Sequence, residues 1–263
     1  MQHLLIITIA VALVGNNPKE EERKLDFKRE RFNIIDNPAF VIRPPVARLV
    51  PTPWVLYAPT LGENLPGKAE EWMFRQFLME GIAIAGVNIG ESFGNPAGRK
   101  IYNKLHDELV RNGFDYKACL LGRSRGGLML YNWAAENPEK VRCITGIYPV
   151  CNLVSYPGLK RASTAYGLTE EQMKQDLPKH NPIDRLQLLA KSKVPIFHIH
   201  GDSDRAVPLS SNSSLVAKRY ADLGGEMKIK IAENQGHNMW NGFFECQELV
   251  DFLIKYATNS AGK

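Results

Sequence analysis

The stretch that decides the fold is KACLLGRSRGGLMLYNWAAENP, residues 117–138. Its first part, KACLL, is apolar and suits a short buried strand, and GLMLYNWAAENP suits a helix that ends near Pro138. Between them, Gly122, Ser124 and Gly126 spell G-x-S-x-G. Glycine on either side of the serine relieves crowding in a strained turn that lifts the hydroxyl clear of the sheet. The strand, turn and helix together predict a nucleophile elbow at Ser124.

Strand-like and helix-like segments alternate on both sides of this stretch, which indicates βα units and a mainly parallel sheet. The expected parallel strands are residues 54–58, 82–89, 117–122, 141–150, 195–201 and 227–233. Two earlier runs, FKRERFNII (27–35) and AFVIR (39–43), are separated by a polar turn and suit an antiparallel edge. The pattern predicts a twisted sheet of about eight strands with helices on both faces.

The longest interruption between expected strands is residues 152–192. This insert contains aromatic and helix-forming residues, and we expect it to form a small cap over the site. The chain has 263 residues, a length at which α/β folds routinely form one domain, here expected over residues 16–263.

The composition and the absence of certain motifs exclude several classes of function. Hydrophobic residues make up 44% and charged residues 23%, as in a soluble globular protein. The net charge of +5 comes from scattered, mixed charge runs typical of a solvated face. No helix-turn-helix, RNP-type or zinc-finger pattern is present, so no nucleic-acid partner is expected. The chain has no CxxC or Cys/His cluster with metal-ligand spacing, and we expect neither a metal nor a cofactor.

The first residues are expected to form a signal peptide, residues 1–15, around the apolar run 4–14. This run is too short to span a bilayer, so no stable membrane insertion is expected. Export is favoured, and the alternative is a hydrophobic tail or first strand of a cytosolic protein. The four cysteines, Cys119, Cys143, Cys151 and Cys246, are favoured as buried small hydrophobes over disulfide partners.

Two motifs that follow the elbow in the sequence each contain a candidate catalytic residue. PIFHIHGDSDRAVP contains HGxxDxxVP, with Asp204 as its acid, and NQGHNMW places Gly236 before His237. With the elbow, they make residues 30–257 resemble the α/β-hydrolase superfamily, in its esterase and prolyl-oligopeptidase-like (dienelactone-hydrolase-like) branch. That resemblance implies a triad in the order Ser124, Asp204, His237. Asp202 lies in the same turn and is the alternative acid.

The three residue types fit nucleophilic catalysis. A serine hydroxyl is a poor nucleophile near neutral pH, so a neutral imidazole must accept its proton during attack. A buried carboxylate then fixes the imidazole tautomer and stabilises the imidazolium. The other histidines are expected to be structural (His198 and His200) or on the surface (His106 and His180).

An oxyanion hole needs two backbone donors. The resemblance implies one from Arg125 and one from the turn after residues 54–58. Many relatives carry His-Gly in that turn, whereas Pro59 here cannot donate, which leaves Thr60 or Leu61 N–H. The Ser-Arg pair also resembles the elbow of glucuronoyl esterases. For the Arg125 side chain, oxyanion stabilisation, a substrate carboxylate and an ordinary salt bridge remain alternatives.

We expect a serine hydrolase that acts on small-molecule or polymeric carboxylic esters through an acyl-enzyme. The alternatives are a serine peptidase or amidase of the prolyl-oligopeptidase-like type and a noncatalytic binding protein with the same fold. Loops at the strand ends are expected to contribute pocket residues, with core or cap packing as the alternative. These candidates are Tyr57, Glu91, Phe93, Tyr156, Tyr166 and Trp240. Acyl and alcohol specificity and oligomeric state do not follow from the sequence.

Overall fold

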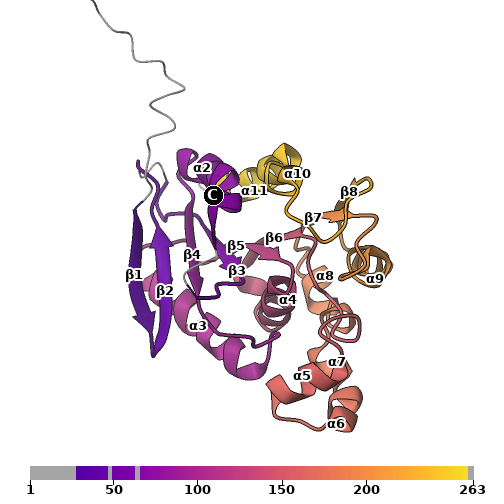
Figure 1. Ribbon diagram of the computed structural model, residues 1–263. Helices are drawn as coiled ribbons and strands as arrows, with labels where there is room; N and C mark the ends of the chain where they lie inside the picture. Colours follow the sequence, from indigo (N-terminus) through magenta and orange to yellow (C-terminus); the bar gives the residue numbers. More distant parts are fainter. Residues whose placement is uncertain (1–27, 47–48, 63–65, 260–263) are drawn as a thin grey trace, which may run out of the picture.

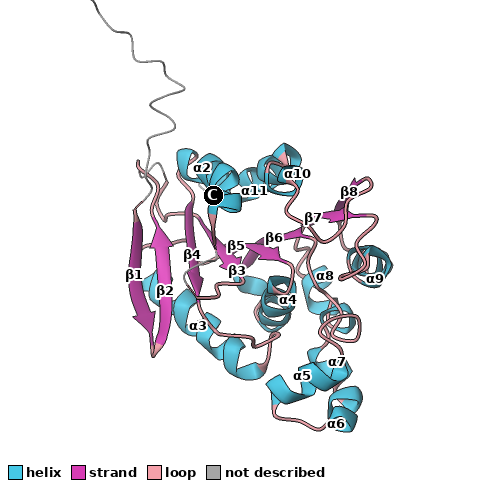
Figure 2. Cartoon of the chain, viewed as in Figure 1, coloured by secondary structure: helices cyan, strands magenta, loops and turns pink. Residues whose placement is uncertain are grey.

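The computed structural model describes residues 28–46, 49–62 and 66–259. Its centre is an eight-stranded sheet in the order β1-β2-β4-β3-β5-β6-β7-β8. Figure 2 shows this twisted sheet with helices on both sides. The strands are β1 (Arg29–Ile34), β2 (Asn37–Ile42), β3 (Trp54–Ala58), β4 (Ala83–Val87), β5 (Ala118–Arg123), β6 (Val141–Ile147), β7 (Ile196–Gly201) and β8 (Met227–Ala232).

The strand pairing confirms the expected α/β-hydrolase architecture. β1 pairs with β2 and β2 with β4 in antiparallel fashion, and every pair from β4 through β3 to β8 is parallel. All five residues of β3 and of β4 are buried, as a sheet covered on both faces requires. Parallel strands end at the same edge, so the loops after β3, β5, β7 and β8 meet there.

The two faces of the sheet carry separate cores. On one face, α3 (Pro96–Arg111), α4 (Gly126–Glu136) and α9 (Ser213–Asp222) pack against strand residues such as Leu56 and Leu120. On the other face, α2 (Glu71–Met79), α10 (Asn241–Phe244) and α11 (Gln247–Thr258) cover Val55 and Leu121. Consecutive side chains of a strand point to opposite faces, so each central strand contributes to both cores.

The insert 152–192 contains α5 (Leu159–Tyr166), α6 (Glu170–Gln175), α7 (Leu177–His180) and α8 (Gln187–Lys191). α5 and α6 contribute to a third cluster with Phe93 and Val207. α8 instead packs into the main core through Leu189. The first three helices therefore gather beside the body, where Figure 1 shows them, and the last belongs to the layer that covers the sheet.

One buried asparagine, Asn212, attaches the insert to the body, and a second, Asn181, links two parts of the insert. The side-chain oxygen of Asn212 accepts hydrogen bonds from the N–H groups of Cys151 (2.9 Å) and Asn152 (3.2 Å). Its amide nitrogen donates to the carbonyl of Pro208 at 3.0 Å. Asn181 Oδ1 accepts from Leu153 N–H at 2.9 Å. The start of the insert is thus tied to the loop that follows β7.

Several expectations concern residues away from the sheet edge. The predicted signal segment 1–15 lies outside the described residues. Within the described ranges, no helix is long and apolar enough to cross a membrane, and no group of three potential metal ligands occurs. All four cysteines are buried free thiols.

His106 was expected on the surface but is 1% exposed, because it packs between the rings of Trp54 and Trp133.

The two histidines of β7 belong to a buried hydrogen-bonded chain. Tyr131 Oη lies 2.8 Å from His198 Nε2, and His198 Nδ1 lies 2.9 Å from Ser213 Oγ. The same hydroxyl lies 2.8 Å from His200 Nδ1, and His200 Nε2 lies 2.8 Å from the carbonyl of Val207. A carbonyl can only accept, so His200 Nε2 carries a proton, and in the neutral imidazole Nδ1 accepts from Ser213.

The remaining protons follow from that assignment. With its own proton given to His200, Ser213 Oγ accepts from His198 Nδ1–H, and His198 Nε2 accepts from the Tyr131 hydroxyl. In this arrangement each imidazole carries one proton. Burial, together with the nearby His200, lowers the pKa of His198 to about 3. Such a fully satisfied polar network fixes the side chains that form it.

The lowered pKa of His198 predicts that acid destabilises the folded protein. Between pH values of about 6.5 and about 3, the unfolded chain binds a proton at residue 198 that the folded chain does not, so stability falls as pH falls. The slope from this one group approaches about 1.4 kcal/mol per pH unit. We expect His198→Gln to be less stable at pH 7 but to lose less stability on acidification, measured by urea unfolding from pH 7 to pH 4. Equal pH slopes for both proteins would contradict the assignment.

Candidate active site

Ser124 occupies the turn between β5 and α4 with φ of +49°, a left-handed conformation that costs energy for a residue other than glycine. Backbone hydrogen bonds hold it there. Its N–H donates to the carbonyl of Ile147 at 3.0 Å, and its carbonyl accepts from Gly127 at 2.9 Å and Val150 at 2.8 Å. The turn is therefore clamped to the end of β6.

The glycines of the elbow are required by close packing. A Cβ on Gly126 would overlap the carbonyl of Ala58, at the end of β3. A Cβ on Gly127 would collide with the carbonyl of Val150. Because no side chain separates these backbones, the start of α4 lies directly against the turn after β3. This approach is what an oxyanion hole shared between those two segments would need.

The structure brings Ser124, His237 and Asp204 together at the sheet edge. Ser124 Oγ lies 2.8 Å from His237 Nε2, and His237 Nδ1 lies 2.7 Å from Asp204 Oδ2. An ionised carboxylate only accepts, so His237 Nδ1–H donates to Asp204 and leaves Nε2 to accept from the serine hydroxyl. The three residues follow β5, β7 and β8, the positions expected from the sequence.

Asp204 is held as an anion inside the protein. Its side chain is fully buried, and its Oδ1 accepts from the N–H groups of Ala206 (3.0 Å) and Val207 (2.8 Å). His200 Nε2 lies 3.5 Å from its Oδ2. Burial by itself raises the pKa of Asp204, but hydrogen bonds from His200, His237 and Val207 outweigh it and hold the pKa well below its usual range.

The alternative acid faces elsewhere. Asp202 is exposed, and its carboxylate accepts a hydrogen bond from the hydroxyl of its neighbour Ser203 at 2.9 Å. Asp204, two residues later, is the carboxylate in contact with His237. The structure thus separates two candidates that the sequence placed in one turn.

A hollow of about 220 Å³ opens over Ser124. It is lined by Pro59, Arg123, Ser124, Arg125, Tyr148, His237, Asn238 and Met239. The ring of Tyr148 packs on the imidazole of His237 with 4.4 Å between centroids, and is supported on another side by Phe243. Sequence reasoning missed Tyr148, which lies in the expected strand 141–150 but directly follows β6 in the structure. It also missed Arg123, which occupies a variable position inside the elbow motif.

The substrate-binding candidates from the sequence do not line this hollow. Tyr57 is fully buried beneath it and donates to Glu70 at 2.7 Å. Phe93 and Tyr156 contact each other edge to face in the third cluster, and Tyr166 donates to the Phe93 carbonyl. Trp240 is 44% exposed and rests on Phe243. These five side chains therefore do not line the hollow over Ser124, and their role in substrate binding stays a prediction.

The last candidate, Glu91, forms an ion pair with Arg125 on the exposed rim. Of the alternatives for the Arg125 side chain, the structure contains the ordinary salt bridge. The backbone of Arg125 is nevertheless at the N-terminus of α4, immediately after Ser124.

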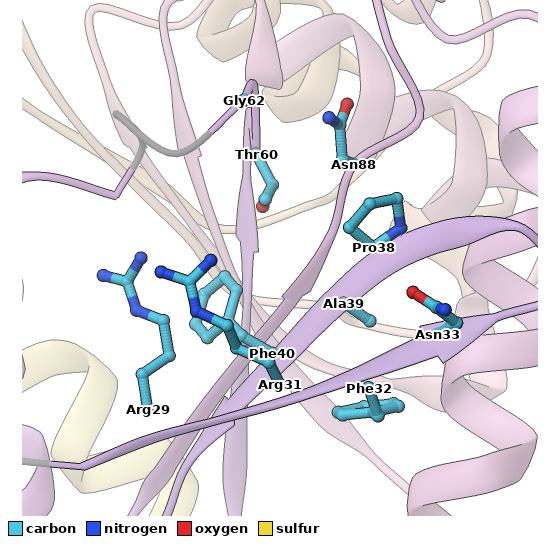
Figure 3. A pocket seen from close by; sticks show the side chains of 10 residues that line it. All are labelled: Arg29, Arg31, Phe32, Asn33, Pro38, Ala39, Phe40, Thr60, Gly62 and Asn88. Carbon is cyan, nitrogen blue, oxygen red and sulfur yellow. The ribbon is translucent and has the colours of Figure 1, made fainter.

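The turn after β3 separates the nucleophile's hollow from a second one. Pro59 lines the hollow over Ser124, whereas Thr60 lines a neighbouring hollow of about 310 Å³. Figure 3 shows Arg29 and Arg31 reaching from β1 toward Thr60 and Gly62, with Asn88 on the opposite side. Thr60 is 6% exposed, and its hydroxyl has no hydrogen-bond partner within the described residues.

The chain resembles known proteins in sequence and in fold. The chain is 27% identical over 130 residues to the acylamino-acid-releasing enzyme of Arabidopsis thaliana, a match that covers 46% of this chain and 17% of that protein. Two similar solved structures are a puromycin-hydrolyzing peptidase of Mycobacterium tuberculosis and an acylaminoacyl peptidase of Pyrococcus horikoshii.

The first structure has a TM-score of 0.68 at 15% identity, over 89% of this chain and 39% of that one. The second has a TM-score of 0.66 at 19% identity, over 89% of this chain and 42% of that one. These likenesses show a shared fold, and the chain spans less than half the length of each relative. The model of the prolyl oligopeptidase family matches residues 104–262, more than half of the chain. The chain therefore belongs to the prolyl oligopeptidase family of serine hydrolases.

Proposed function

We propose that this protein is a serine peptidase or amidase that cleaves its substrate through an acyl-enzyme on Ser124. The observation that carries the proposal is the hydrogen-bonded series from Ser124 Oγ through His237 to a buried, ionised Asp204. Membership of the prolyl oligopeptidase family favours amide bonds over the carboxylic esters that we expected from the sequence. Ester hydrolysis uses the same intermediate, so esters serve as comparison substrates.

In the proposed first step, Ser124 Oγ attacks the carbonyl carbon of the scissile bond while its proton passes to His237 Nε2. The imidazolium is stabilised by Asp204, whose low pKa keeps it ionised throughout. The tetrahedral intermediate collapses when the C–N bond breaks, and His237 gives the proton to the leaving amine nitrogen. What remains is an ester between Ser124 and the acyl group.

In the second step, water replaces the amine. His237 Nε2 accepts a proton from the water as its oxygen attacks the acyl carbon, and the proton then returns to Ser124 Oγ as the acid product leaves. The negative oxygen formed in each step needs two N–H donors. We assign these to Arg125 and to Thr60 or Leu61. The close contact between Gly126 and Ala58 supports this pairing because it joins the two segments.

The proposal predicts that a fluorophosphonate probe labels the protein at Ser124 and that Ser124→Ala abolishes labelling. Turnover should fall by about 10³-fold or more, since the hydroxyl supplies the covalent bond. We expect the rate enhancement over spontaneous hydrolysis to be larger for an anilide than for a phenyl ester of the same acyl group. Absence of labelling would refute the nucleophile, and turnover restricted to esters would restore the esterase interpretation.

A second prediction concerns the acid. Asp204→Asn should lower kcat by about 10³- to 10⁴-fold, because a neutral amide no longer fixes the tautomer of His237. Asp202→Asn is the matched control and should change kcat by less than about twofold, since that side chain is exposed and contacts Ser203. Steady-state kinetics of both variants, with circular dichroism to verify folding, provide the measurement. A larger loss in Asp202→Asn than in Asp204→Asn would reverse the assignment.

A further inference from the structure

Arg123 lies immediately before Ser124 and lines the same 220 Å³ hollow. It is the last residue of β5, and its side chain is 15% exposed. A guanidinium at this depth has lost most of its hydration, so its remaining N–H donors need acceptors. The acceptors that it has in the described structure are of unequal quality.

One side of the guanidinium is firmly held. Arg123 Nη1 donates to Glu70 Oε1 at 2.7 Å, and the guanidinium carbon lies 5.1 Å from the centroid of Phe244. Glu70 is fully buried and also accepts from Tyr57 Oη (2.7 Å) and from Gly67 N–H (2.9 Å). These contacts fix the arginine in one orientation, which reduces the entropy lost when a ligand binds to it.

The other side meets the Tyr148 hydroxyl, which also lines the hollow, and a weak acceptor. Arg123 Nη2 lies 2.9 Å from the thioether sulfur of Met239, which also lines the hollow. Thioether sulfur accepts hydrogen bonds poorly, and the Met239 side chain is flexible and 53% exposed as a residue. A charged oxygen would therefore be a much better partner for Nη2 than this sulfur, and the sulfur is free to move aside.

The rest of the lining favours a negative group. Among the described residues that line the hollow, none is acidic, and Arg125 adds a second cation, which is paired with Glu91 on the rim. Glu70 offsets part of the Arg123 charge but lies buried among Tyr57 and the 67–70 turn rather than in the hollow. The volume suits one side chain of amino-acid size beside the reacting carbonyl.

We propose that Arg123 selects substrates in which the residue that supplies the scissile carbonyl carries a carboxylate on its side chain. The enzyme then cleaves after acidic residues. A carboxylate oxygen of the substrate takes the place of the Met239 sulfur on Arg123 Nη2 while the carbonyl carbon faces Ser124. This inference rests on the proposed function, because it needs Ser124 as the nucleophile. It adds the substrate class.

The test compares two isosteric substrates, the p-nitroanilides of N-acetylglutamate (free side-chain carboxylate) and N-acetylglutamine, with one preparation of enzyme. They differ only in the charge of the side chain. We expect kcat/KM to be about tenfold or more higher for the glutamate substrate, the size of a charge-assisted hydrogen bond. Equal values, or a preference for glutamine, would overturn the proposal.

Variants assign the preference to Arg123. Arg123→Gln should bring the glutamate-to-glutamine ratio close to one, as should the double variant Glu70→Gln with Arg123→Gln, which leaves no unpaired buried carboxylate. The ratio is taken within each preparation, so a smaller folded fraction cancels. Arg205→Gln is the matched control, because it removes the same charge from an exposed position in the Asp204 loop and should retain the ratio. A ratio lost in Arg205→Gln but retained in Arg123→Gln would refute a direct contact.

A third measurement separates failure of the inference from failure of the proposed function. Lack of fluorophosphonate labelling at Ser124 would overturn the proposed function itself. If Ser124 is labelled but neither anilide turns over, protection by the free products decides. N-acetylglutamate should then slow labelling at a concentration about tenfold lower than N-acetylglutamine does, and equal protection would overturn the inference alone.

Discussion

The buried carboxylate of Asp204 is the constraint on which the rest of the site depends. It sits where the polar chain inside the sheet meets the imidazole at the surface, with His200 on one side and His237 on the other. An uncompensated charge at this depth would be costly, and each of its hydrogen bonds offsets part of that cost. Two backbone N–H groups of its own loop complete the set. The buried groups that hold Asp204 therefore also determine where His237 lies.

Much of the fold and of the three-residue core of the site could be predicted from the sequence. The elbow at Ser124 is a local pattern, and glycine, serine and the flanking strand and helix are all visible within residues 117–138. Asp204 and His237 follow expected strands, and parallel strands end at a common edge. What the sequence left open, Asp202 or Asp204, depends on the direction of side chains within one turn. Only three-dimensional geometry fixes that direction.

The walls of the hollow could not be predicted in the same way. Tyr57 lies near the end of β3, but its side chain points to the face covered by α2, where Phe74 packs on it. Arg123 was overlooked because the motif treats its position as variable, and only the structure shows the buried Glu70 that orients it. His106 looked like a surface residue in a polar helix, yet two tryptophans distant in sequence enclose it. In each case the deciding partner is remote along the chain.

Two consecutive residues, Asn212 and Ser213, serve different parts of the molecule. Asn212 anchors the start of the insert, and Ser213 joins the two strand histidines that lead to Asp204. Both are fully buried at the beginning of α9. The insert is therefore not an interchangeable module. Grafting the corresponding segment from a relative would require the same asparagine geometry, and any shift of that junction would be transmitted to the acid by the adjacent serine. A change of the insert is thus constrained by the same buried hydrogen bonds that hold Asp204 in place.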